Sequence, residues 1–363
     1  DGCWEVMVQG KTNYFYEHVH ALKIMEYFMM HGRSLVTGEI EWRDCGDPSR
    51  YQSYEEFYDA YMHEVLTMAN DVVDNFIKHR PTRYKINPSV LLSAITDDCI
   101  AKGRDIHNKG CRYTIYGLYL TGFSHVIDSL AAIKKYVYEE KSLSMDELCE
   151  AMRTNYEGRE ALRQMLQREA PKYGNGDAYA DEIAVRFIKD FSDFVREKNK
   201  EPKVLEAQPN FMLSAACGTF EHYVMFGREC GASADGRPYM YSVASNYSPS
   251  LGVDVKGPTA TIRSATSPDL IKFYSGGPVD IGINAKDIQG EEGIDRLMSL
   301  IDSFGELGGS IMTLQVMNTE QLRDAQVHPE KYPTLRVRMG GMSVYFTMLA
   351  KVQQDVIIRR AKG

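Results

Sequence analysis

One short stretch near the C-terminus, with two adjacent glycines between apolar residues, constrains this chain more than any other part of it. The stretch reads Leu335-Arg-Val-Arg-Met-Gly-Gly-Met-Ser-Val-Tyr-Phe346. Leu335 and Val337 predict a strand before the glycine pair, and the residues after it follow an amphipathic helical pattern. Glycine is the usual residue where a backbone bends sharply, so the pair by itself indicates a tight turn.

The composition is that of a globular protein with ample material for a core. The chain has 363 residues, of which 44% are hydrophobic and 25% are charged, and this length suits one large domain or two of medium size. The net charge of −8 argues against nucleic acid or an anionic membrane as a partner. We also expect no membrane span and no secretory signal, since no apolar run of sufficient length is found.

The cysteines and histidines lack the spacings of a metal site. No Cys-x-x-Cys pair and no His-Glu-x-x-His motif occurs, so we expect no metal centre. An odd number of widely spaced thiols suits a reducing compartment, and we predict a cytoplasmic protein. The cysteines are Cys3, Cys45, Cys99, Cys111, Cys149, Cys217 and Cys230.

Apolar periodicity predicts a chain of helices followed by a mixed region. We expect Pro81 to end the longest helix, because proline removes a backbone donor. Glycine, serine and proline are frequent in 211–264, which indicates loops and strands. The alternation of helices and strands after this segment indicates α/β units. The predicted helices are 19–30, 54–79, 86–101, 124–140, 179–197, 294–304 and 319–325, and strands are predicted at 311–316 and 335–339.

Two further motifs stand out in the first and the middle part of the chain. Gly2-Cys3-x-Glu5 is followed by Gly10-Lys11, although a Cys-x-Glu alone is usually an ordinary thiol beside a surface charge. The segment 226–237 reads Phe-Gly-Arg-Glu-Cys-Gly-Ala-Ser-Ala-Asp-Gly-Arg, where Asp235 and Arg237 are expected to form a structural ion pair. Five further stretches belong to the same set of motifs: 97–103, 128–135, 170–175, 248–249 and 256–260.

Taken in order, these segments and the glycine stretch resemble the motifs of the pyruvate formate-lyase-like glycyl radical enzymes. The family motifs read Arg-Val-x-Gly-Tyr-x-x-x-Phe at the glycine loop and Gly-Cys-x-Glu-Pro-x-x-x-Gly-Lys at the cysteine loop. The resemblance covers essentially all 363 residues but only the C-terminal half of a typical member. The chain departs from the family motifs at Val6, Ala234, Met339 and Met342.

The resemblance implies a role for three residues. Gly341 would store the radical, and glycine suits this role because a planar Cα radical would be crowded by a side chain. The S–H bond of Cys3 is weak enough to pass a hydrogen atom to that radical, and the resulting thiyl would attack a substrate C–H bond. Glu5 would then act as an acid or base on the substrate. No cofactor is expected to be bound, because a separate radical S-adenosylmethionine activating enzyme would install the radical.

Glu17 is a candidate substrate-binding residue. In the dehydratase branch of the family, an aspartate fourteen residues after the reactive cysteine holds substrate hydroxyls, and Glu17 has that spacing from Cys3. The alternative is a carboxylate at the start of a helix, near the positive end of the helix dipole. The neighbouring aromatic residues Tyr14, Phe15 and Tyr16 suit either a pocket lining or a core.

The resemblance also implies the fold. We expect an α/β protein that forms the C-terminal half of a ten-stranded barrel surrounded by helices, with the cysteine and glycine loops meeting inside. Residues 1–225 would hold the cysteine loop, helices and half-barrel, and 226–363 would form the glycine radical domain. The N-terminal half-barrel would be another chain or an absent segment, since the chain opens with Asp1 as a fragment or processed product would. A homo-oligomer is expected.

The expected activity is that of an anaerobic glycyl radical lyase acting on a small organic molecule. Trp4 breaks the pair of adjacent cysteines found in pyruvate formate-lyase itself, and Glu5 favours the eliminating and decarboxylating branches. The favoured interpretation is elimination from a hydroxylated or aminated substrate, of the dehydratase or carbon–nitrogen lyase type. An arylacetate-type decarboxylase is the alternative, suggested by the aromatic residues at 14–16. A non-catalytic radical-domain subunit is the third, and the presence of Cys3 argues against it.

Overall fold

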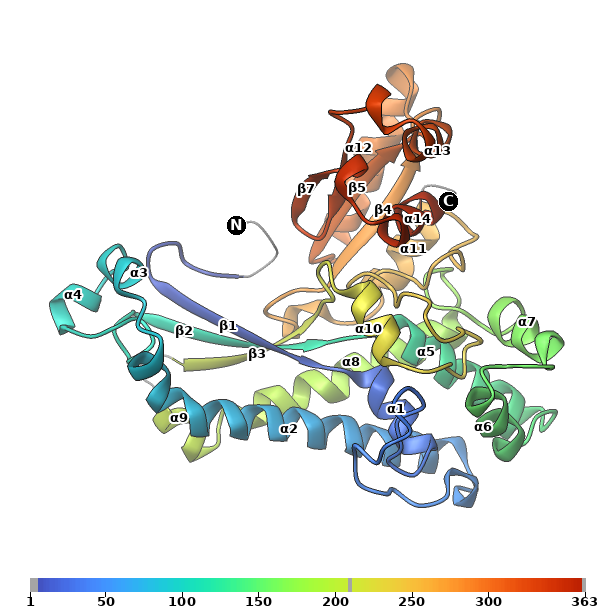
Figure 1. The fold of residues 1–363 in the computed structure, drawn as a ribbon, viewed down its shortest axis with the longest axis horizontal. Helices are drawn as coiled ribbons and strands as arrows, with labels where there is room; N and C mark the ends of the chain where they lie inside the picture. Colours follow the sequence, from blue (N-terminus) through green and yellow to red (C-terminus); the bar gives the residue numbers. More distant parts are fainter. Residues whose placement is uncertain (1–5, 208–210, 361–363) are drawn as a thin grey trace.

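A parallel sheet of three strands crosses the larger part of the molecule (Figure 1). The computed structural model describes residues 6–207 and 211–360, so the predictions for Cys3 and Glu5 lie outside the described residues. The strands are β1 (Thr12–Val19), β2 (Tyr113–Leu120) and β3 (Phe211–Cys217), and they lie in the order β1-β2-β3.

The first sheet has two different faces. On β1 the side chain of Phe15 points to the helices, since its ring lies 5.3 Å from that of Phe76. Tyr116 of β2 points the same way and stacks on Phe76 at 3.8 Å. Because strand side chains alternate, the opposite face carries Tyr14, Tyr16 and His18 together with Ile115, Gly117 and Tyr119 of β2. We call this opposite surface the tyrosine face.

The helix-covered face packs on long helices (Figure 1). They include α1 (Ala21–Met29), α2 (Tyr54–Ile86), α5 (Phe123–Ala132) and α8 (Ala178–Lys198), and α5 continues into a π-helical segment, Ile133–Glu139. The predicted helices 19–30, 124–140 and 179–197 are confirmed. The prediction of one helix over 86–101 is wrong, because the chain breaks at Asp98, which has φ +72°, and forms two short helices instead. The shorter helices are α3 (Val90–Ala94), α4 (Cys99–Lys102), α6 (Met145–Arg153), α7 (Glu160–Arg168), α9 (Pro202–Ala207), α10 (Tyr223–Glu229) and α11 (Pro258–Thr266).

The prediction that Pro81 ends the long helix is wrong, because α2 continues to Ile86. Proline costs one backbone hydrogen bond at that turn. The neighbouring Arg80 is only 5% exposed, and its guanidinium lies 5.1 Å from the ring of Phe15 and 5.2 Å from that of Phe76. This packing holds the turn against the sheet and offsets the lost bond.

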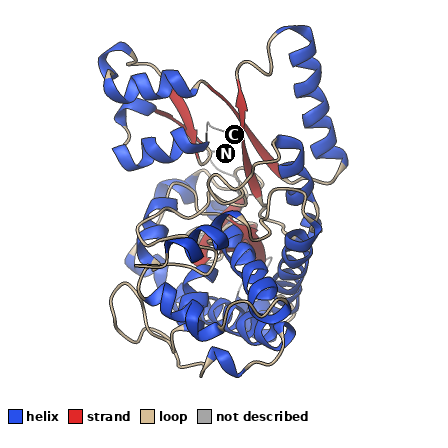
Figure 2. Cartoon of the chain, turned by 90° about the vertical axis from the view of Figure 1, so that its right-hand side faces the viewer, coloured by secondary structure: helices blue, strands red, loops and turns tan. Residues whose placement is uncertain are grey.

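A second parallel pair of strands follows in the C-terminal part. It consists of β4 (Pro278–Asn284) and β5 (Ile311–Met317), connected through α12 (Gly290–Glu306) and followed by α13 (Thr319–Val327). Figure 2 shows the strands of this upper part lying between two groups of helices, with the larger helical body below them. Two backbone bonds join β3 to the segment that leads into β4: Cys217 N donates to Gly276 O at 3.0 Å, and Ser275 N donates to Ala215 O at 3.2 Å.

The fold is therefore α/β, as predicted, with one parallel sheet of three strands and one parallel pair, each in chain order. Within 6–207 and 211–360 these strands do not close into a barrel. No helix in the described part of the chain is long and apolar enough to cross a membrane.

The glycine pair joins two strands, so the prediction of a helix directly after it is wrong. β6 (Arg336–Met339) and β7 (Met342–Tyr345) form an antiparallel hairpin, in which Met339 pairs with Met342. Hydrogen bonds between the two strands satisfy the backbone N–H and C=O groups that would otherwise bond within a helix. The helix comes later, as α14 (Lys351–Arg360). The hairpin is fastened to β5 because Gln315 Nε2 donates to the carbonyl of Arg338 at 2.9 Å.

Candidate active site

The two glycines at the tip of the β6–β7 hairpin differ in backbone conformation. Gly340 has φ +60°, in the left-handed region that favours glycine, and it is buried. Gly341 is partly exposed and is not among the described glycines with positive φ. A two-residue hairpin turn with glycine at its first position has this pattern. The turn therefore explains a glycine at 340, and the backbone conformation does not require one at 341.

A cavity of about 640 Å³ lies on the tyrosine face, at the end of the sheet where β1 begins. The segment 6–8, which directly follows Glu5 in the chain, forms one of its walls. The other walls come from the three strands and from α8 with its following residues. The lining residues are Val6, Met7, Val8, Thr12, Tyr113, Ile115, Arg196, Asn199, Phe211, Met212 and Tyr274.

A chain of hydroxyl groups crosses the tyrosine face beyond this cavity. The hydroxyls of Tyr14 and Tyr119 lie 2.9 Å apart, and Tyr14 donates to Ser275 Oγ at 2.7 Å. Ser275 in turn donates to Ser214 Oγ at 2.7 Å. The sequence interpretation missed Tyr119, Ser214 and Ser275. The alternation of residues in β2 could have placed Tyr119 on the same face as Ile115, the partner of Tyr14 in the register. Ser275 comes from a loop that leaves no periodic signal.

The tyrosine face next to the hydroxyl chain is aromatic and uncharged. The ring of Tyr16 lies 5.1 Å from that of Phe220, and the ring of His18 lies 4.8 Å from that of Phe226. Burial, together with the neighbouring His222, lowers the pKa of His18 to about 4. His18 is therefore neutral at pH 7, and its Nδ1 lies 3.1 Å from Thr121 Oγ1.

Glu17 lies on β1, so the alternative of a helix-start carboxylate is wrong. Its side chain is exposed and shares the helix-covered face with Phe15, which places it opposite Tyr16 and His18. The pKa of Tyr116 supports this placement. It is raised mainly by burial and also by the nearby charge of Glu17. The structure therefore brings Tyr14 and Tyr16 to the cavity side of the sheet and leaves Glu17 at the sheet edge, on the other side.

The expected ion pair between Asp235 and Arg237 is wrong. Asp235 Oδ2 lies 2.6 Å from His125 Nδ1, and both side chains are buried. Burial opposes ionisation of Asp235, but His125 and Lys172 hold its pKa well below its usual range. The guanidinium of Arg237 donates instead to backbone carbonyls, among them that of Tyr241 at 2.8 Å. Residues of the 226–237 segment thus hold loops together, as the structural interpretation expected.

Burial disfavours the thiolate form at two of the described cysteines. Burial raises the pKa of the Cys217 thiol well above its usual value and that of Cys149 to about 12. Among residues 6–207 and 211–360, no group of three or more His, Cys, Asp or Glu side chains could hold a metal ion.

Comparison with known families agrees with the motifs. A family model described as pyruvate formate lyase-like matches residues 1–227, and a model described as glycine radical matches residues 243–347. The first match alone covers more than half of the chain. The chain therefore belongs to the pyruvate formate-lyase-like glycyl radical enzymes.

Known relatives include enzymes with different substrates. Trans-4-hydroxy-L-proline dehydratase of Clostridioides difficile is 33% identical over 99% of this chain and 45% of its own length. Isethionate sulfite-lyase of Oleidesulfovibrio alaskensis is 34% identical over 99% of this chain and 43% of its own length. Indoleacetate decarboxylase of Tractidigestivibacter scatoligenes is 30% identical over 80% of this chain and 37% of its own length.

The fold agrees with a solved relative as well. The crystal structure of hydroxyproline dehydratase from Clostridioides difficile, with trans-4-hydroxy-L-proline bound, superposes with a TM-score of 0.89 at 32% identity. The superposition covers 99% of this chain and 44% of that chain. The chain thus spans less than half the length of the relatives it matches.

Proposed function

We propose that this chain is the catalytic C-terminal half of an anaerobic glycyl radical lyase. Gly341 stores the radical, Cys3 carries it to the substrate, and Glu5 moves a proton. The observation that carries the proposal is the hairpin tip, where the turn accounts for Gly340 but leaves Gly341 without a conformational reason to be glycine. Storage of a planar Cα radical supplies that reason.

The reaction follows from bond strengths and proton transfer. The Gly341 radical takes the hydrogen atom of the Cys3 S–H bond, and the thiyl that remains takes a hydrogen atom from a substrate C–H bond. The substrate radical then loses a neighbouring leaving group, to which Glu5 delivers a proton. The product radical finally takes a hydrogen atom back from Cys3, and the radical returns to Gly341. The cysteine is thus regenerated in each cycle.

Elimination from a small hydroxylated or aminated substrate is the favoured reaction. The relatives at 33% and 34% identity are named as a dehydratase and a sulfite-lyase, which both eliminate a leaving group. The cavity beside the segment 6–8 is the part of the substrate chamber that this chain would contribute. Glu17 remains the proposed contact for a substrate hydroxyl, by its spacing from Cys3.

An arylacetate-type decarboxylase is the second candidate. Tyr16, Tyr119 and Phe220 form an uncharged aromatic cluster on the tyrosine face, with ring centroids 5.1 to 5.5 Å apart, and such a surface suits an aromatic ring. A non-catalytic radical-domain subunit is the third candidate. It gives no reason for the Cys3–Glu5 motif, so we place it last.

The proposal includes two macromolecular partners. A radical S-adenosylmethionine activating enzyme would remove the hydrogen atom from Gly341, and an N-terminal half-barrel, in the same or another chain, would complete a ten-stranded barrel around the substrate. Residues 226–363 would be the glycine radical domain. We further propose a homo-oligomer in the cytoplasm, where thiols stay reduced.

Electron paramagnetic resonance of the activated protein tests the proposal. The full enzyme is incubated without dioxygen with a family activating enzyme, S-adenosylmethionine and a reductant, and we expect a doublet from the remaining Cα hydrogen of Gly341. Trans-4-hydroxy-L-proline, isethionate and indoleacetate are then offered to the same sample. A radical without turnover of any offered substrate would leave the storage site standing and the substrate class open, whereas no radical at all would contradict the proposal.

A further inference from the structure

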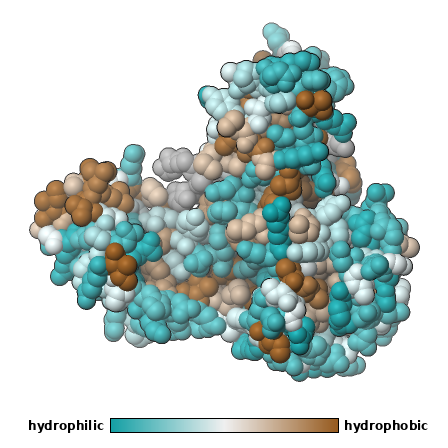
Figure 3. All heavy atoms as spheres, viewed as in Figure 1, coloured by the Kyte–Doolittle hydropathy of each residue, from teal (hydrophilic) through white to brown (hydrophobic). Residues whose placement is uncertain are grey.

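An apolar surface with no cover lies at the far end of α2, where the chain turns through α3 and α4. Six exposed aliphatic side chains belong to this part of the chain, and Figure 3 shows a brown, hydrophobic region over the two short helices. We call them the aliphatic patch. They are Ile86 (83% exposed), Val90 (72%), Leu91 (79%), Leu92 (46%), Ile95 (69%) and Ile100 (74%).

A folded domain rarely leaves an apolar surface of this kind exposed to water. Single exposed apolar residues are common, but contiguous patches of more than a few hundred Å² usually mark an interaction site. Leu91 and Ile95 are four residues apart, and both are exposed, the first in α3 and the second directly after it. Burial of such side chains against a partner is favourable because it removes apolar surface from water.

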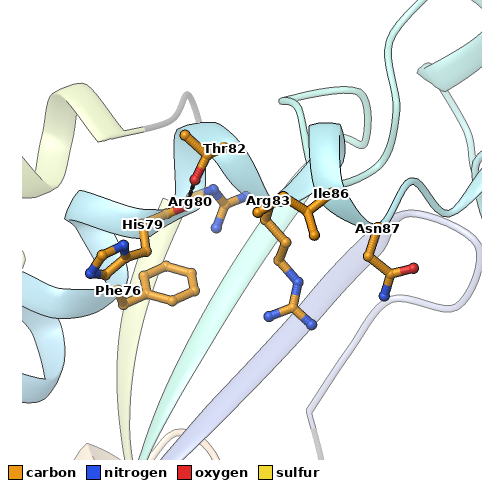
Figure 4. Close-up of a pocket in the computed structure, with 7 residues that line it drawn as sticks. All are labelled: Phe76, His79, Arg80, Thr82, Arg83, Ile86 and Asn87. Atoms are coloured by element: carbon orange, nitrogen blue, oxygen red, sulfur yellow. Dashed lines mark hydrogen bonds between the residues drawn. The ribbon is translucent and has the colours of Figure 1, made fainter.

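A pocket of about 330 Å³ adjoins the patch and shares Ile86 with it. Figure 4 shows its lining side chains, which extend from the last turns of α2: Phe76, His79, Arg80, Thr82, Arg83, Ile86 and Asn87. The floor is apolar, because the ring of Phe76 stacks under the sheet residue Tyr116. The pocket has room for one or two side chains of a partner.

Arg83 gives the surface a charge preference. Its guanidinium lies over the ring of Phe15 at 4.9 Å, and the residue is exposed. Within the described part of the chain no carboxylate forms an ion pair with it. A partner that covers the patch would therefore place an acidic side chain at this edge of the pocket.

We infer that the aliphatic patch and the adjoining pocket dock the part of the enzyme that corresponds to the unmatched length of its relatives. The chain covers only 45% of the dehydratase it resembles, so more than half of such an enzyme lies outside the match. The pocket also adjoins β1, since the guanidinium of Arg83 lies over the ring of Phe15, and β1 is an edge strand of the first sheet. We therefore identify the partner that covers this surface as the N-terminal half of the enzyme. This inference rests on the proposed function, because only that function requires a second half.

The first experiment asks whether the occupant is a second copy of this chain. Sedimentation of the 363-residue chain is compared with that of a Leu91→Ser/Ile95→Ser variant and of an Ile271→Ser control. Ile271 is 82% exposed and belongs to the C-terminal part, away from the patch. We expect the patch substitutions to leave the oligomeric state unchanged. A dimer that dissociates in the patch variant alone would overturn the inference in favour of self-association.

The second experiment measures coverage of the patch directly. Leu91→Cys and Ile271→Cys are labelled with a maleimide in the chain alone and in a fusion that places the unmatched N-terminal part of the Clostridioides difficile dehydratase before Asp1. We expect labelling at position 91 to slow by about tenfold or more in the fusion, with no change at position 271. Equal rates at position 91 in a folded fusion would overturn the inference.

The intact dehydratase provides the same test where the fusion does not fold. Cysteines are introduced at its positions aligned with Leu91 and Ile271, and slow labelling only at the first supports the inference. Fast labelling at both would contradict it. An Arg83→Glu substitution in the fusion should speed labelling at position 91, because it opposes the expected acidic partner. None of these readouts depends on a radical, so failure of the proposed chemistry and failure of this surface are distinguishable.

Discussion

The thiol of Cys230 lies 3.4 Å from Nε2 of His20, and both side chains are buried. A cysteine beside a histidine is a common arrangement for a nucleophilic thiolate. Here, however, burial raises the pKa of Cys230 to about 12 and lowers that of His20 to about 3. Both groups are uncharged at pH 7, so the pair is a packing contact. The pair therefore lacks the thiolate that a Cys–His nucleophile would need.

The depressed pKa of His20 makes the stability of the fold depend on pH. The unfolded chain takes up a proton below the ordinary value of 6.5, whereas the folded chain does so only near 3. Stability is thus lost as pH falls below 6.5, by up to about 1.4 kcal/mol per pH unit, or about 2 kcal/mol between pH 7 and 5. His18, whose pKa lies near 4, adds to the effect.

Urea unfolding of the parent and of His20→Gln at pH 7 and pH 5 measures this contribution. The substitution removes the cap that His20 Nδ1 provides to Lys23 N, so some stability is lost at both pH values. The expected result is a smaller loss between the two pH values in the variant than in the parent. An equal loss in both proteins would show that His20 has the same pKa in the folded and unfolded states, and would contradict the prediction.

The hairpin provides a matched pair of glycines for the storage site. Gly341→Ala should abolish the radical signal while the fold is kept, because the backbone there does not require glycine. Gly340→Ala should keep the signal but lose about 1–2 kcal/mol of stability, since alanine disfavours φ +60°. Paramagnetic resonance and thermal unfolding of both variants check this pair. A full signal in Gly341→Ala would falsify the assignment.

The parts of the fold and of the candidate site that depend on local sequence alone could be predicted. The glycine motif predicted the match to the glycine radical family, which is found over residues 243–347, and apolar periodicity located α8 and β5 closely. Tertiary contacts decided the rest. Pro81 stays helical because Arg80 packs on aromatic rings across the sheet.

The partner of Asp235 depended on residues distant in the sequence. Asp235 pairs with His125, which is 110 residues away in the chain, so the nearby Arg237 was the wrong choice. Side-chain direction on β1 likewise needed the structure, because the segment 12–19 alternates too weakly in polarity to be recognised as a strand. Because this strand was not recognised, the placement of Tyr16 and Glu17 on opposite faces of the sheet could not be predicted.

Dioxygen should cleave the activated protein at the radical position. A Cα radical adds dioxygen, and the backbone then breaks at that residue, so the expected lesion lies at Gly341. Mass spectrometry after exposure to air should find a shortened chain and a C-terminal peptide beginning near Met342. The Gly341→Ala protein, treated with the activating enzyme in the same way, should stay intact. An unchanged mass in the activated parent would count against storage at this residue.

Glu17 gives a prediction about substrate binding. If its carboxylate accepts a hydrogen bond from a substrate hydroxyl, Glu17→Gln loses a charged hydrogen bond worth about 1.5–3 kcal/mol. KM should then rise by roughly tenfold or more, since 1.4 kcal/mol corresponds to a factor of ten. Glu39→Gln, also exposed, serves as the control with an unchanged KM. Because Glu17 lies on the helix-covered side of β1, an unchanged KM in Glu17→Gln would assign it to the surface.

Storage of the radical and chemistry on the substrate should separate in variants of the cysteine loop. Cys3→Ser should retain the radical on Gly341 and lose turnover, because an O–H bond is too strong to pass a hydrogen atom to a glycyl radical. Glu5→Gln should also retain the radical, and it should lose the general acid–base contribution, which is typically about 10²–10⁴-fold. In an elimination the leaving group needs that proton, so we expect the upper part of this range. In a decarboxylation Glu5 would matter more for placement of the substrate, and the loss should be smaller. Turnover and radical content measured in the same sample decide the question, and Cys3→Ser activity comparable to the parent would end the thiyl mechanism.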